Sequence, residues 1–202
     1  MKKITIALIM VISLITPIQT MAESVTQNGT IIEPLEQNIE QIIDEITSGP
    51  RPINSDAIQN VKEYISEYFG NLGYDNIEYQ KFEYNDENNE NAIRHSSQAD
   101  VFLASTAENA IVDGIGENII VTKNSSIDTT KNLIISAHYD SAEDSVGAND
   151  NGSGVAAVLE LARILKDTEI PYNIKFILFS GEEKYMLGSR WYVGNLSEDE
   201  RK

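Results

Sequence analysis

Residues 131–183 read KNLIISAHYDSAEDSVGANDNGSGVAAVLELARILKDTEIPYNIKFILFSGEE, and this stretch decides the fold. It begins with KNLIISA at 131–137, a short apolar run that predicts a buried strand. A polar loop with glycines follows at 147–154, and the apolar spacing after it predicts a helix from Ser153 to Lys166. A second apolar run, NIKFILF at 173–179, predicts another strand. A strand, a helix and a strand in this order predict a right-handed crossover between two parallel strands.

Metal-binding side chains stand where each predicted strand ends. His138 follows the first strand directly, and Glu182 and Glu183 follow the second. Asp150 lies in the glycine-containing loop between them. Parallel strands end at the same edge of a sheet, and open α/β sheets bind ligands at that carboxyl edge. We therefore expect these four side chains to converge, although they lie far apart in the sequence.

These residue types indicate zinc chemistry. Imidazole nitrogen and carboxylate oxygen suit zinc, and the chain has no cysteine to compete for the metal. Asp150 could bridge two ions with its two oxygens, and the adjacent Glu182 and Glu183 suggest one metal ligand and one general base. Asp140, two residues after His138, could orient the imidazole. The alternative is a set of solvated acids and a surface histidine, but their places at consecutive strand ends favour the metal site.

Three motifs within this stretch carry a family resemblance. They are SAHYDS at 136–141, GANDNGSGVAAVLELARIL at 147–165 and FSGEE at 179–183. In order and spacing they resemble the di-zinc aminopeptidases of the bacterial leucyl aminopeptidase and aminopeptidase Y type, a clan that also contains carboxypeptidases and glutaminyl cyclases. The resemblance implies an α/β fold, with three α/β/α layers around a mixed, mainly parallel central sheet, as in zinc exopeptidases.

The resemblance also implies a role for each candidate residue. The zinc ligands would be His138 on one ion, Asp150 between two ions and Glu183 on the second. Glu182 would be the general base, and Asp140 the partner of His138. The implied enzyme is a zinc metallopeptidase that hydrolyses N-terminal peptide bonds with metal-activated water.

The chain departs from the family pattern at one position just after the third motif. The family usually has glycine where this chain has Tyr185, a change that could narrow the site entrance. The resemblance also implies a cis peptide bond between Asp150 and Asn151. A complete site would hold two Zn²⁺ ions and would need a further aspartate and a second histidine. Asp199 stands in a charged tail with no strand before it, and no histidine follows His138.

We therefore expect the sequence to hold about the first two-thirds of such an enzyme, with a sheet that is incomplete at its C-terminal end. Two alternatives to an active aminopeptidase stay open. One is a non-catalytic truncated product or weak metal-binding module, and the other is a carboxypeptidase or glutaminyl cyclase of the same clan.

Composition limits the partners. The chain has 202 residues with 32 acidic and 15 basic side chains, a formal net charge of −17. Such an acidic chain is a poor partner for nucleic acid or an anionic membrane, so we expect a peptide substrate. Apolar residues at 41% are enough for a core. The other histidine of the chain, His95, stands in a polar, asparagine-rich stretch without a metal motif and is expected to be a solvated loop residue.

The beginning of the chain predicts export. Lys2 and Lys3 precede an apolar stretch from Ile4 to Ile15, and the sequence at 20–22, TMA, fits a small-x-small cleavage site. The stretch is shorter than the ~20 residues that span a bilayer, so a cleaved secretory signal is favoured over an uncleaved anchor. We expect a secreted protein, in the medium or associated with the cell envelope, with a signal peptide at 1–22, a lead-in and helix at 23–45 and the catalytic domain at 46–202.

The residues before the metal-binding motifs predict helices and a strand that support the site. Helices are expected at 33–47 and 56–71, the second with Ser55 as its N-cap. A strand is expected at 77–84, with a bulge where its apolar alternation changes phase.

Two further elements complete the prediction. A strand at 118–122 is expected to pair antiparallel with residues 133–137. A helix is expected after Glu183, through about Val193.

Overall fold

The computed structural model describes residues 25–27, 30–32, 34–84, 113–198 and 200. The expected signal peptide, His95 and Asp199 lie outside these residues. Among the described residues, no helix has the length and apolar character needed to cross a bilayer.

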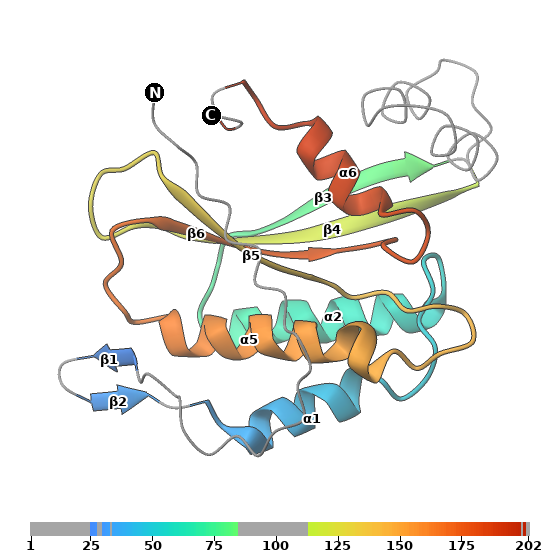
Figure 1. Cartoon of the computed structure of the whole chain (residues 1–202), viewed down its shortest axis with the longest axis horizontal. Helices are drawn as coiled ribbons and strands as arrows, with labels where there is room; N and C mark the ends of the chain where they lie inside the picture. The colour runs from blue at the N-terminus through green and yellow to red at the C-terminus, as the bar shows by residue number, and fades with distance from the viewer. Residues whose placement is uncertain (1–24, 28–29, 33, 85–112, 199, 201–202) are drawn as a thin grey trace.

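A four-stranded sheet forms the centre of the molecule, with helices on both faces (Figure 1). Its strands, in the order β3-β4-β6-β5, are β3 (Ile77–Tyr84), β4 (Gly114–Lys123), β6 (Asn173–Phe179) and β5 (Asn132–His138). On one face lie α1 (Glu36–Ile46), α2 (Asp56–Asn71) and α5 (Ser153–Leu165), and on the other α6 (Leu187–Gly194). A separate two-stranded sheet pairs β1 (Val25–Gln27) with β2 (Thr30–Ile32). The mixed α/β architecture predicted from the sequence is confirmed.

The strand order differs from the expected one. β6 lies between β4 and β5, so the predicted antiparallel pairing of β4 with β5 is wrong. Most residues of β6 are buried, as suits a central strand, whereas β5 lies at the edge of the described sheet and exposes 38% of Ile134. Of the three pairings, only β5–β6 is parallel, so the mainly parallel character expected from the sequence is not seen among the described strands.

No bulge interrupts β3, contrary to the prediction. Its residues pair one to one with β4 from Ile77 to Tyr84. Phe82 packs beside Leu187 of α6, while Ile77 packs into the core under α2, on the opposite face. The apolar residues change phase because each face of this strand is covered by a different helix.

The main core lies between the sheet and α1, α2 and α5. α5 presents an apolar stripe to the sheet because its buried residues recur at helical spacing, and those in the main core are Val155, Ala156, Val158, Leu159 and Ala162. α2 begins as predicted, with the Ser55 hydroxyl accepting a hydrogen bond from the Ile58 N–H at 3.1 Å.

α1 is joined to α5 by a buried carboxylate. Glu160, 2% exposed, accepts hydrogen bonds from the Leu35 N–H at 2.8 Å and the Asn38 amide at 3.3 Å, at the start of α1. Arg163 donates two more, at 2.8 and 2.7 Å. Burial alone would raise the pKa of Glu160, but these hydrogen bonds outweigh it and hold the pKa below the usual value near 4.5.

Glu160→Gln is expected to lower the free energy of unfolding by about 1.5–3 kcal/mol at pH 7, because hydrogen bonds to a buried charge are lost. The folded pKa of Glu160 is depressed, so its contribution is fully present above about pH 4.5 and is lost as the pH falls through the folded value. Urea unfolding of both proteins at pH 7 and pH 3 measures the difference. Glu67→Gln, at an exposed position of α2, is the control. A difference that is equally large at pH 3 would contradict the assignment.

Candidate metal centre

The predicted site residues lie at one edge of the sheet. His138 is the last residue of β5, and in the parallel register it pairs with Phe179, the last residue of β6. Glu182 and Glu183 follow after Ser180 and Gly181. The two strands therefore end side by side, as the crossover predicts.

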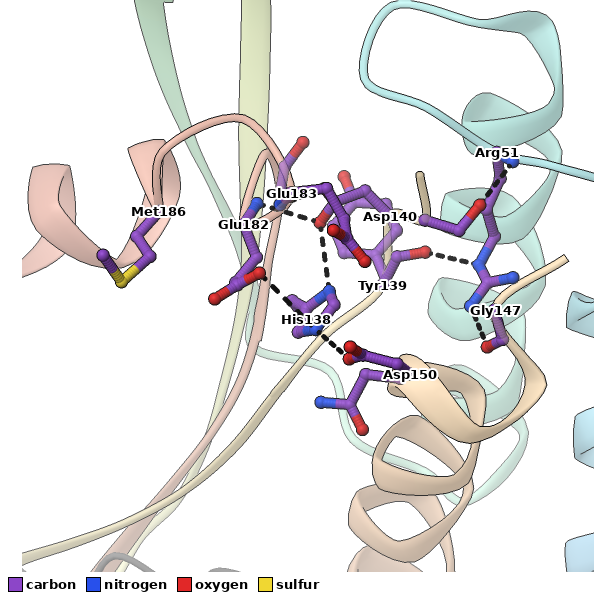
Figure 2. A network of polar contacts seen from close by, with 12 residues as sticks. Arg51, His138, Tyr139, Asp140, Gly147, Asp150, Glu182, Glu183 and Met186 are labelled. Atoms are coloured by element: carbon purple, nitrogen blue, oxygen red, sulfur yellow. Dashed lines mark hydrogen bonds and ion pairs between the residues drawn. The ribbon is translucent and has the colours of Figure 1, made fainter. Parts of the chain in front are cut away.

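The candidate ligand atoms are close together (Figure 2). His138 Nε2 lies 3.0 Å from Asp150 Oδ1 and 3.9 Å from Glu182 Oε2. His138, Glu182 and Glu183 each offer a ligand atom within 4.8 Å of the other two. The imidazole is largely buried, whereas the Asp150 side chain is 76% exposed. The cluster thus has a buried nitrogen at its base and carboxylates on its open side.

Asp140 joins the two strand ends. Its Oδ1 accepts a hydrogen bond from the Glu182 N–H and its Oδ2 one from the Glu183 N–H, both at 3.1 Å. The same Oδ1 lies 3.5 Å from His138 Nδ1, and Asp140 is 1% exposed. The sequence predicted the pairing with His138 but missed the two backbone contacts, for which it carries no signal. One carboxylate thus holds the backbone of both glutamates and lies beside the imidazole.

The cluster has more acidic side chains than basic ones. Burial lowers the pKa of His138, but Asp140, Glu182 and Asp150 outweigh it, so the pKa lies above its usual value. Burial and the neighbouring carboxylates raise the pKa of Glu183, and the charge of His138 acts in the opposite direction. Four acids around one imidazole favour a bound cation, and imidazole nitrogen with carboxylate oxygen is a donor set that fits zinc.

Asp150 stands on a tight irregular turn, η1 (Ala148–Gly152), and its peptide bond to Asn151 is cis, as the resemblance implies. Gly147 precedes the turn with a φ of +57°. A Cβ there would lie 2.5 Å from the Asp150 carbonyl oxygen and 2.7 Å from Ser141 Cβ. Only glycine fits this position without displacing the turn.

The backbone is left-handed at Tyr185 and Met186. Tyr185 and Met186 have φ values of +66° and +58°, a left-handed conformation that side chains with a Cβ rarely adopt. Both side chains are exposed beside the turn that carries Glu182 and Glu183, and the Met186 N–H donates to the Glu182 carbonyl at 2.8 Å.

Arg51 is a buried residue near the cluster that sequence reasoning missed. It is 0% exposed and contacts the loop between His138 and Asp150. The only local signal is an arginine between Pro50 and Pro52, directly after α1.

Comparisons with known proteins identify similar peptidases. Residues 118–202 match the model of peptidase family M28. The chain is 45% identical to aminopeptidase YwaD of Bacillus subtilis strain 168 over 94 residues, 46% of this chain and 21% of that protein. It is 32% identical to a vacuolar membrane protease of Schizosaccharomyces japonicus over 151 residues, 75% of this chain and 16% of that protein. The chain thus spans about a fifth or less of these curated relatives.

A solved structure shares the fold. The crystal structure of BSAP, a zinc aminopeptidase from Bacillus subtilis, superposes with a TM-score of 0.64 over 81% of this chain and 66% of that one, at 20% sequence identity.

Proposed function

Residues 118–202 match the model of peptidase family M28, and from this premise we propose that the protein is a zinc-dependent aminopeptidase. It would remove N-terminal residues from peptides. The observation that carries the proposal is the convergence of His138, Asp150, Glu182 and Glu183 at the carboxyl edge of β5 and β6. The zinc aminopeptidase fold of the structural neighbour supports it.

The residues would divide the work by position. His138, Asp150 and Glu183 would hold zinc, and Asp150 would be shared between two ions, as the family resemblance implies. Glu182 would be the general base, the role that the family resemblance implies for it, and its 39% exposed side chain can reach a water molecule. Asp140 holds the backbone of both glutamates and faces the imidazole.

Bound zinc would supply Lewis acidity, which polarises the peptide carbonyl and lowers the pKa of the attacking water. Glu182 takes a proton from that water and passes it to the nitrogen of the leaving amine. Asp140 keeps His138 oriented and the Glu182 backbone fixed while the proton moves.

The proposal extends to export and domain organisation. Lys2, Lys3 and the apolar stretch after them support a cleaved signal at 1–22 and a secreted protein. Residues 23–45 would lead into the catalytic domain at 46–202. The net charge of −17 supports a peptide substrate over nucleic acid or an anionic membrane.

Zinc titration by calorimetry, combined with hydrolysis of a leucyl anilide, tests the proposal. Tight binding of two equivalents of zinc, with zinc-dependent release of the anilide, would support a working aminopeptidase site. The same anilide with an acetylated N-terminus is the control and should not be cleaved, because an aminopeptidase needs the free amine. One weak equivalent without turnover would instead identify a non-catalytic metal-binding module.

Asp140→Asn is expected to weaken zinc binding about 10–100-fold, as removal of an outer partner of a metal-bound histidine does. Asparagine keeps one acceptor oxygen and replaces the other with an NH2 donor, so one of the two glutamate N–H groups loses its acceptor. Calorimetry measures the change. Asp144→Asn makes the same chemical change at an exposed position of the same loop and should leave the affinity unaltered. Equal affinities for the two variants would contradict the role of Asp140.

A further inference from the structure

Arg51 places a buried positive charge against neutral groups of the main chain. Its Nε donates to the Tyr139 carbonyl at 2.7 Å and its Nη2 to the Gly147 carbonyl at 3.0 Å (Figure 2). Its Nη1 donates to the Val146 carbonyl. Burial lowers the pKa of Arg51, and the charges of Asp140 and Glu183 act in the opposite direction. Burying a cation costs free energy, and the hydrogen bonds to the three carbonyls together with the nearby carboxylates offset that cost.

The three carbonyls lie on the loop that joins two candidate zinc ligands. Tyr139 directly follows His138, and Gly147 lies at the start of the turn that carries Asp150. The Gly147 carbonyl also accepts the Gly152 N–H at 2.9 Å, which closes the turn around Asp150. One guanidinium is therefore connected to both ends of the loop.

The main chain of Arg51 strengthens the same connection. Its N–H donates to Ser141 Oγ at 2.9 Å, and its carbonyl accepts the Ser141 N–H at 3.3 Å. Ser141 Oγ in turn donates to the Ser145 carbonyl at 2.9 Å. The segment after α1 and the loop after β5 are thus paired along both backbone and side chain.

We propose that Arg51 is a positioning residue, which holds the loop at 139–147 so that His138 and Asp150 face each other before zinc binds. The inference rests on the proposed zinc site. The planar fork of guanidinium donors suits several carbonyls at once, whereas a lysine ammonium has the same charge at a single point. Substitution by lysine keeps the charge of Arg51 but not its donor geometry, and substitution by glutamine removes the charge, so the two contributions can be measured separately.

The test compares Arg51→Lys and Arg51→Gln with the wild type, with Glu160→Gln as a control that disturbs a buried ionic group away from the cluster. Zinc affinity is measured by calorimetry, and amide hydrogen exchange is measured on the metal-free proteins. We expect both Arg51 variants to bind zinc about 10–100-fold more weakly, the range for partners that orient metal ligands. We also expect faster exchange at the Gly152 and Ser141 N–H groups, while Glu160→Gln leaves the zinc affinity and these two amides unchanged.

Each outcome decides between the alternatives. Full zinc affinity in Arg51→Lys, with weak binding in Arg51→Gln, would overturn positioning in favour of a simple counter-charge. Equal losses in Glu160→Gln would show that only general stability was measured. If the Arg51 variants do not fold, Ser141→Ala decides, and unchanged exchange of the loop and unchanged zinc affinity there would overturn the proposal. If the wild type binds no zinc, the proposed function is refuted. Amide exchange would still test whether Arg51 stabilises the loop at 139–147.

Discussion

Glu182→Gln is expected to lower kcat for leucyl anilide hydrolysis about 10²–10⁴-fold, the usual contribution of a general base. Glutamine has nearly the shape of glutamate but cannot accept the proton of the attacking water. The Glu182 N–H would still donate to Asp140, so the turn should keep its conformation. Zinc binding should therefore stay within a few-fold of the wild type, and calorimetry on the same samples checks this. Turnover that survives the substitution would show that another group is the base.

Glu183→Gln is the matched comparison because it makes the same change at the next residue. The ligand atoms of His138, Glu182 and Glu183 lie within 4.8 Å of one another, so the geometry alone permits either glutamate to bind metal. We expect Glu183→Gln to weaken zinc binding and Glu182→Gln to preserve it. The reverse result would exchange the two roles while leaving the metal centre in place.

His138→Ala is expected to weaken zinc binding more than about 100-fold, because loss of outer partners alone costs about 10–100-fold and this change removes the proposed ligand itself. His138 is the one nitrogen donor of the described cluster, and alanine would leave only carboxylates. Calorimetry measures the affinity, and circular dichroism checks the fold.

Glu143→Ala is the control for the histidine substitution, since Glu143 is exposed on the loop between His138 and Asp150. It should bind zinc as the wild type does. Retention of tight zinc binding by His138→Ala would place the metal away from the ends of β5 and β6, and the proposed site would then be wrong.

The local sequence pattern was enough to locate most helices and strands. Helix α2 begins at Asp56 behind Ser55, and β6 runs from Asn173 to Phe179, both as predicted. Periodicity and capping act over a few residues, so they can be read directly from the chain. The convergence of His138 with the acids at 150, 182 and 183 followed from the crossover rule, because that rule fixes where two parallel strands end.

The local sequence pattern could not predict which strands pair with each other in the sheet. The strand at 118–122 was expected beside β5, but it pairs with β3 and β6 instead. An apolar run indicates that a strand is buried without identifying its neighbours. The phase change in β3 likewise suggested a bulge, while the structure explains it by helices on both faces.

The sequence by itself determined the α/β class, the positions of the main helices and strands, and the residues that meet at the carboxyl edge. Only the tertiary structure decided the strand order, the hold of Asp140 on the backbone of both glutamates, and the contact of Arg51 with the loop before Asp150. The physical reason is that these contacts join a side chain to main-chain groups far away in the chain. Every residue carries such N–H and carbonyl groups, so no residue type marks the ones that a buried carboxylate or guanidinium will meet.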